Sequence, residues 1–313
     1  MVKIRYFEGK DTNEIIDLWN KALPLDGITH NLFERKIILD GNREKEGFII
    51  AEKDKEIVGF IFCIVYRRPI GTEPIDTTRG FITVMAIHPD YKGQGIGSKL
   101  LTEAIEFFKK RNRKLITIAP YPINYFVPGI DKERYPDGVK LFQKFGFEEY
   151  YEAISMDGII TKFEIPEKVL GKEKELKKQG VIIRQYQRSD LYDYLEFMDD
   201  KMPKPWLEDA RRNLIALTYG NFEEDSIFLA LKDNQIIGYC QYEGEHFGPF
   251  GVIDEFQGQG VGSVLLAKTL YQMRLKGCHS AWVVWTGEQA AKRVYARLGM
   301  NITRRFAIMK KEL

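Results

Sequence analysis

The chain has few of the features that mark a secreted, disulfide-rich or metal-binding protein. It contains three cysteines, Cys63, Cys240 and Cys278, which lie far apart and form no CxxC or other metal-ligand spacing. Cys63 and Cys240 stand inside apolar strand patterns, where cysteine packs as a small hydrophobic residue. The pattern predicts a reducing compartment and no metal site.

Long apolar runs and a strong charge imbalance are also missing. The longest apolar run, residues 60–66, is far shorter than a membrane span. Residues 1–20 carry several acids and no apolar core segment, so we expect no signal peptide, no membrane association and, by default, a cytoplasmic location. The formal net charge of +2 gives no reason to expect a nucleic-acid partner.

What the sequence does contain is a glycine-rich stretch that occurs twice. Residues 93–101 read GQGIGSKLL and residues 258–266 read GQGVGSVLL. In both, a short apolar run comes before the glycines and an amphipathic helical pattern follows, which predicts strand, turn and helix. A helix N-terminus offers unpaired N–H groups and a positive dipole end, and glycine lets an anion approach the backbone. The repeat indicates two phosphate-binding domains of one design.

The duplication extends beyond the glycines. At a constant offset of 179, Val2, Ile4, Arg5 and Asp11 recur as Val181, Ile183, Arg184 and Asp190. The hairpin at 53–59 recurs at 232–238, and the offset falls to 165 at the glycine turn because the second copy has a shorter connection before it. We therefore predict two domains by internal duplication, 1–165 and 181–313. The highly charged segment 166–180 between them is predicted to be a linker or a short solvated helix.

The glycine turn resembles the signature of the GNAT superfamily of N-acetyltransferases, Gln/Arg-x-x-Gly-x-Gly/Ala after a strand and at the start of a helix. The second copy supplies residues 257–262, QGQGVG, and the first supplies residues 92–97, KGQGIG, with lysine in place of Gln or Arg. No Gly-Lys-Ser/Thr follows, which argues against a P-loop. The helix and hairpin before the turn argue against an opening βαβ unit of the dinucleotide-binding type.

The resemblance implies an α/β fold, with mixed sheets, made of two tandem GNAT acyl-CoA N-acyltransferase domains. It also implies acetyl-CoA as the cosubstrate and a primary amine of a small molecule or peptide as the acceptor. The implied cofactor-binding residues lie on each glycine turn and the strand before it. They are Ala86, Ile87, Lys92, Gly93, Gln94, Gly95, Ile96, Gly97 and Ser98 in the first copy, and Val252, Ile253, Gln257, Gly258, Gln259, Gly260, Val261, Gly262 and Ser263 in the second.

The catalytic role is expected in the second copy. In the family a tyrosine within a pattern like Asn-x-x-Ala-x-x-x-Tyr-x-x-x-Gly-Phe commonly returns a proton to the departing thiolate. Residues 288–300 follow this pattern and supply Tyr295, with Glu288 in place of Asn and Met300 in place of Phe. The first copy has Phe142 there, which carries no exchangeable proton. The alternative for Tyr295 is an aromatic ring that only packs between helix and sheet.

Other roles stay open at this stage. Glu245 and His246 are candidates for a general base, and they could equally be strand-edge residues. The aromatic loop 121–131 in the first copy either shapes an acceptor pocket or packs against the second domain. Two rival functions remain: the first copy is the catalyst, or one or both copies bind coenzyme A without catalysis. The acceptor and the oligomeric state are not encoded in these patterns.

Overall fold

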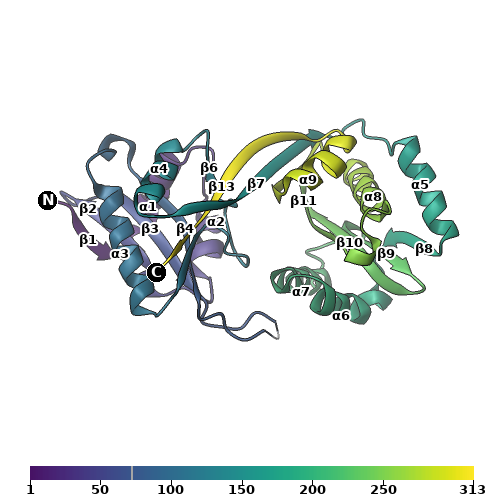
Figure 1. The fold of residues 1–313 in the computed structure, drawn as a ribbon, viewed down its shortest axis with the longest axis horizontal. Helices are drawn as coiled ribbons and strands as arrows, with labels where there is room; N and C mark the ends of the chain where they lie inside the picture. The colour runs from purple at the N-terminus through teal and green to yellow at the C-terminus, as the bar shows by residue number, and fades with distance from the viewer. Residues whose placement is uncertain (72) are drawn as a thin grey trace. The chain divides into compact units, whose positions relative to one another are not determined.

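The computed structural model describes residues 1–71 and 73–313, which form two compact units (Figure 1). Unit 1 comprises residues 1–153 and 305–313, and unit 2 comprises residues 154–304. These units do not coincide with the predicted domains 1–165 and 181–313, because the chain passes between the units twice, after residue 153 and after residue 304.

Unit 1 is a sheet with helices on both faces. Its strand order is β1-β2-β3-β4-β5-β13, with β6 beside β13. The β4–β5 pair is parallel. Its elements are β1 (Lys3–Tyr6), α1 (Thr12–Ala22), α2 (His30–Phe33), β2 (Phe48–Lys53), β3 (Glu56–Val65), β4 (Arg79–Ile87), α3 (Ile96–Lys110), β5 (Leu115–Ile118), β6 (Ile130–Asp131), α4 (Pro136–Lys144) and the first half of β7 (Glu148–Ile159), with β13 (Asn301–Glu312) from residue 305 onward.

Unit 2 repeats this plan with the strand order β7-β12-β11-β10-β9-β8. Helix α8 and the preceding α5 pack on one face of the sheet, and α6 with α7 pack on the other (Figure 1). Its elements are the second half of β7, α5 (Glu167–Lys178), β8 (Val181–Gln185), α6 (Leu191–Lys201), α7 (Lys204–Thr218), β9 (Ile227–Lys232), β10 (Gln235–Glu243), β11 (His246–Val252), α8 (Val261–Leu275), β12 (Ser280–Thr286) and α9 (Glu288–Ala290).

The duplication is visible in local geometry as well as in sequence. Arg5 holds Asp11 at 2.6 Å, and Arg184 holds Asp190 at the same distance. The Arg184 guanidinium keeps the pKa of Asp190 below its usual value, with burial acting in the opposite direction. The hairpins β2–β3 and β9–β10 both turn through two residues of positive φ, which matches the twist of antiparallel strands.

The last strand of each copy completes the sheet of the other unit. Strand β5 of unit 1 pairs antiparallel with β13, where Thr117 lies opposite Lys310. Strand β12 of unit 2 pairs antiparallel with β7, where Trp282 lies opposite Asp157. Because β7 ends the first copy and β13 ends the second, a division of the sequence into contiguous copies misses this exchange.

The charged segment, predicted to be a linker or a short solvated helix, forms helix α5 of unit 2. It packs against α8 and buries Leu176, while its other face carries the lysines and glutamates. Val169, seven residues before Leu176, is partly buried against the same core, so α5 docks through a narrow apolar stripe. Among the residues that the structure describes, no helix is long and apolar enough to cross a membrane.

Candidate functional site

Both glycine-rich turns open a long helix with a left-handed residue. Gly95 precedes α3 with φ 77°, and Gly260 precedes α8 with φ 94°. A side chain at such a position costs about 1–2 kcal/mol, which explains the glycine. The first four N–H groups of each helix have no partner within the helix and lie at the positive end of its dipole. Each turn is therefore suited to bind a phosphate.

Glutamine side chains brace the turns and leave the backbone amides to a ligand. In unit 2, Gln257 Nε2 donates to the Val252 carbonyl at 3.1 Å, and Gln259 Nε2 donates to the Glu255 carbonyl at 2.7 Å. Gln94 makes the corresponding bond in unit 1. The side-chain amides of Gln257 and Gln259 already donate to carbonyls within the loop. The cofactor binding predicted for these two residues would therefore use their backbone N–H groups.

The strand before each turn separates from its parallel neighbour. In unit 2, β11 and β12 pair through His246, the first residue of β11, and Trp282, the third residue of β12, and no further pair between them occurs in the described chain. In unit 1, β4 and β5 pair along residues 79–82 and 115–118. The rest of β11 and β4 therefore presents backbone groups that an extended ligand with amides can pair with, as an added strand does. Both open strands lead directly to a glycine turn.

Tyr295 lies against the open part of β11. Its ring centroid is 5.9 Å from that of Phe247 and 6.5 Å from that of Phe250, both edge to face. The side chain is 5 % exposed. Burial raises the pKa of its hydroxyl, and a hydrogen bond with Thr286 acts in the opposite direction. The hydroxyl therefore keeps its proton at neutral pH, as a proton donor must.

Comparison with known proteins shows what both copies are. The profile of the Acetyltransferase (GNAT) family matches residues 12–125 and 191–300. The chain belongs to the GNAT family. This confirms the predicted resemblance and the predicted mixed α/β fold class with two GNAT regions.

Curated relatives of this GNAT chain match one part of it. An uncharacterized N-acetyltransferase of Archaeoglobus fulgidus is 33% identical over 90 residues, 27% of this chain and 55% of the relative. The [ribosomal protein bS18]-alanine N-acetyltransferase of Haemophilus influenzae is 27% identical over 124 residues, 38% of this chain and 81% of the relative. The match to the archaeal relative thus spans about half of its length.

Solved structures match the whole tandem. A GCN5-related N-acetyltransferase from Sphaerobacter thermophilus has a TM-score of 0.72 at 16% identity, covering 99% of this chain and 95% of that one. A tandem GNAT protein from the clavulanic acid biosynthesis pathway has a TM-score of 0.65 at 14% identity, covering 100% and 98%. At such identities the similarity concerns the fold alone.

The Glu245 carboxylate of this GNAT chain is occupied by structural hydrogen bonds. It accepts from the backbone N–H groups of His279 and Ser280, both at 2.9 Å, and from the Ser280 hydroxyl at 2.6 Å. The Ser280 hydroxyl bond and these backbone bonds lower the pKa of Glu245. A carboxylate with lowered proton affinity is a poor general base, so its role is to fix the start of β12.

His246 lies at the closed end of the gap between β11 and β12. Its ring is 4.4 Å from that of Trp282, the residue opposite it in the parallel pair. Val252 is six strand steps of about 3.3 Å from His246, so the glycine turn is about 20 Å away along β11. Tyr295 meets the same strand at Phe247, the next residue, so distance from the turn does not distinguish the two, and the role of His246 stays a prediction.

The corresponding place in unit 1 is filled by apolar side chains. Phe142 stands where the second copy has tyrosine, and it packs edge to face against Phe147 at 5.2 Å. The aromatic loop that follows β5 packs into the α1/α2 side of the same unit, where Phe126 meets Trp19 at 4.8 Å. The loop is also tied down by the Tyr121 hydroxyl, which is 3.1 Å from Asp40. The loop is therefore part of the core of unit 1.

A lysine that the sequence patterns did not indicate lies against the glycine turn of unit 2. A Cβ atom placed on Gly260 would lie 2.6 Å from Cγ of Lys172, which comes from α5. Lys172 also pairs with Glu175 at 2.5 Å. Because segment 166–180 was predicted to be a linker or a short solvated helix, nothing in the sequence pattern connected its lysines with the glycine turn 86 residues away (258 − 172).

We expect Lys172→Gln to weaken coenzyme A binding to unit 2. A half-exposed lysine beside a bound phosphate contributes about 0.3–1 kcal/mol, so the Kd should rise about two- to fivefold, and less at high salt. Calorimetric titration with coenzyme A at low and high salt measures this. Lys174→Gln, on the same helix, is the matched control. Tighter binding by Lys172→Gln would instead mean that this lysine covers the turn.

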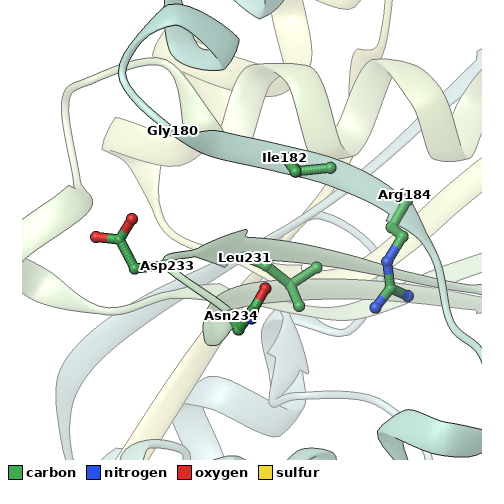
Figure 2. A pocket seen from close by; sticks show the side chains of 6 residues that line it. All are labelled: Gly180, Ile182, Arg184, Leu231, Asp233 and Asn234. Carbon is green, nitrogen blue, oxygen red and sulfur yellow. The ribbon is translucent and has the colours of Figure 1, made fainter.

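A recess at the edge of unit 2 is separate from the glycine turn (Figure 2). Six residues of β8, β9 and their flanking turns line it: Gly180, Ile182, Arg184, Leu231, Asp233 and Asn234. Its guanidinium is already engaged with Asp190, so we assign no ligand to it. In the described part of the chain, no group of three or more His, Cys, Asp or Glu side chains is placed to hold a metal ion.

Proposed function

We propose that the chain is an N-acetyltransferase that moves an acetyl group from acetyl-CoA to a primary amine, and that unit 2 performs the transfer. The observation that carries the proposal is the pair Tyr295 and Phe142. Unit 2 has a buried, protonated hydroxyl beside its open strand, and unit 1 has a phenyl ring at the matching position. Family membership of both copies supports the reaction class.

The donor would lie along the open half of β11, with its pyrophosphate on the first amides of α8. Those amides converge because Gly258 and Gly260 both take positive φ. Gly262 serves a different purpose: a Cβ there would lie 2.9 Å from Phe250 Cζ, so glycine allows α8 to approach β11. The same arrangement in unit 1 uses Gly93 and Gly95.

Acetyl transfer from acetyl-CoA to an amine requires one proton donor from this chain. The neutral amine nitrogen attacks the acetyl carbonyl carbon, the carbon–sulfur bond breaks, and its electron pair goes to sulfur. Tyr295 gives its proton to the thiolate as it departs. The proton that the new amide nitrogen sheds restores the tyrosine through solvent. We assign no proton transfer to Glu245 or His246.

Unit 1 supports a second role, coenzyme A binding without transfer. Its glycine turn keeps the left-handed geometry at Gly93 and Gly95, and a Cβ at either glycine would meet no atom within 4 Å. Phe142 offers no proton, and the loop with Tyr121 and Phe126 occupies the α1/α2 side of its sheet. A unit that can hold the donor and cannot protonate a thiolate would bind coenzyme A for stability or for sensing.

Alanine at each turn tests which unit binds and which unit reacts. Gly260→Ala should raise the Kd of unit 2 for coenzyme A about tenfold, because alanine resists the φ of 94° and its Cβ would also press on the Lys172 side chain. Gly95→Ala introduces the same backbone strain in unit 1 without such a contact. Calorimetry counts the sites, and thiol release measures transfer from acetyl-CoA to polyamines, aminoglycosides, amino acids and peptides. The peptides should include one with N-terminal alanine, the residue in the name of the Haemophilus relative.

Transfer should fall with Gly260→Ala and survive with Gly95→Ala. The reverse pattern would assign the chemistry to unit 1. Two binding sites with no transfer to any amine in the panel would favour the sensing role over the transferase.

A further inference from the structure

Unit 2 holds three buried oxygen atoms that have no hydrogen-bond partner on the α6/α7 side of β10. They are the hydroxyls of Tyr194, on α6, and of Tyr239, on β10, and Oε1 of Gln241, also on β10. The side chains are 0 %, 0 % and 3 % exposed. The two tyrosine rings lie 5.9 Å apart, and Tyr239 and Gln241 share a strand face because they are two residues apart.

Such atoms are costly to keep. A buried polar group without a partner destabilises a fold by about 1–3 kcal/mol. The duplication shows that the fold does not require them. At the offset of 179, the positions of Tyr194, Tyr239 and Gln241 are occupied in unit 1 by three fully buried hydrocarbon side chains. These are Ile15, Phe60 and Phe62.

The cluster of Tyr194, Tyr239 and Gln241 adjoins the open half of β11. Tyr239 lies opposite Gly251 in the β10–β11 ladder. Gln241 lies beside the bulge in that ladder, where the register shifts between residues 240 and 242. Two of the three residues, Tyr239 and Gln241, therefore lie on the strand next to the one along which the proposed donor lies.

The segment that joins α6 to α7, with the start of α7, covers β11 at Gly251, the residue opposite Tyr239. A Cβ atom on Gly251 would lie 2.7 Å from Met202 Sδ and 3.2 Å from Trp206 Cζ3. Both side chains are partly exposed, so a ligand would reach the cluster past them. Gly251 in turn leaves room for this segment to rest on the strand.

The hydrogen-bond acceptors of the cluster and its aromatic surroundings favour a ligand that has an amine group on an apolar stem. Two hydroxyls and an amide oxygen accept hydrogen bonds, and amine N–H groups supply them. The surroundings are aromatic: Phe197 and Trp206 each lie 6.1 Å from the Tyr239 ring, and such faces also attract ammonium groups. In addition, Asp209 of α7 acts electrostatically on both tyrosines.

We propose that Tyr194, Tyr239 and Gln241 bind the amine end of the acceptor, and that the acceptor is a primary amine on an apolar, aryl or alkyl stem. This inference rests on the proposed transferase function of unit 2 and narrows its acceptor class. The residues position the substrate and take no part in the proton transfer assigned to Tyr295.

Phenethylamine is the probe, and 2-phenylethanol is its uncharged control of the same shape. We expect phenethylamine to raise the melting temperature of the full chain more than 2-phenylethanol does. Tyr194→Phe and Tyr239→Phe should each weaken phenethylamine binding about three- to tenfold, since each removes one hydrogen bond. Without the probe, both variants should melt at the same temperature as the parent or higher, because each removes a hydroxyl without a partner.

Tyr186→Phe is the matched control. Tyr186 packs 6.0 Å from the Tyr194 ring, and its hydroxyl is not among the buried atoms without a partner. It should leave phenethylamine binding unchanged. If Tyr194→Phe and Tyr239→Phe lower the melting temperature and leave phenethylamine affinity unchanged, the hydroxyls are structural and the inference is wrong.

The same experiment separates this inference from the proposed function. Binding of phenethylamine that depends on the two hydroxyls, without acetyl transfer to any amine, supports the amine site and contradicts the transferase. Transfer to a sugar amine or peptide, with no binding of phenethylamine, supports the transferase and overturns the acceptor class inferred from the cluster.

Discussion

The Tyr295→Phe enzyme should transfer acetyl groups about 100 to 1,000 times more slowly than the parent, with little change in the Kd for coenzyme A. The change removes one oxygen from a side chain that packs against Phe247 and Phe250 and leaves the ring in place. General acids contribute about 10²- to 10⁴-fold, and solvent can replace part of that. Steady-state kinetics of thiol release measure kcat, and calorimetry measures coenzyme A binding.

Two controls sharpen the Tyr295 experiment. Phe142→Tyr places the hydroxyl at the matching position of unit 1, and it should not restore transfer to the Tyr295→Phe chain if unit 1 lacks an open acceptor side.

The second control is the pH dependence of kcat in the parent enzyme. Because burial raises the pKa of Tyr295 above its usual value near 10, loss of this proton should not lower kcat between pH 7 and about 10. Full activity of the Tyr295→Phe enzyme would show that Tyr295 is not the proton donor and that its ring only packs between helix and sheet.

A chain that ends at Arg304 should lose the folded structure of unit 1 and keep much of unit 2. Residues 305–313 supply the strand that pairs with β5, and Phe306, Ile308 and Met309 are buried there. Burial of each such side chain contributes about 1.5–3 kcal/mol, so their joint loss approaches the whole stability of a domain, about 5–15 kcal/mol. Hydrogen exchange followed by mass spectrometry should show β5 amides exchanging at least about 100-fold faster.

A longer truncation product provides the matched control. A chain that ends at Glu312 loses only Leu313 and keeps the three residues that pair with β5, so β5 should stay protected. In both chains the amides of β10 report on unit 2. Equal protection of β5 in the parent and in the chain that ends at Arg304 would show that unit 1 does not depend on the exchanged strand.

The sequence predicted the local structure and the position of the two glycine turns well because short-range chemistry determines both. The offset of 179 located the hairpins and the Arg–Asp pairs, since each copy repeats the same turn residues and charges. Positive φ at Gly95 and Gly260 follows from the need to open a helix at a turn.

The features that the sequence did not predict all depend on contacts between distant segments. Which strand completes which sheet cannot be read from a hydrophobic pattern, because β7 and β13 have equivalent patterns and would fit either sheet. Lys172 belonged to a segment whose composition suggested a linker or a short solvated helix, with no packing partner. Glu245 was a plausible base by residue type alone, and its three hydrogen bonds come from His279 and Ser280, 34 and 35 residues later in the chain (279 − 245 and 280 − 245).

The exchange of last strands also means that unit 1 cannot complete its sheet until the end of the chain has been synthesised on the ribosome. Thr117 and Lys310, which lie opposite each other in unit 1, are 193 residues apart (310 − 117). At about 5–20 residues per second, β5 waits roughly 10–40 s for its neighbour. During that interval the nascent chain carries an unpaired sheet edge, the kind of surface on which other chains add strands. The N-terminal half, although made first, is therefore finished last.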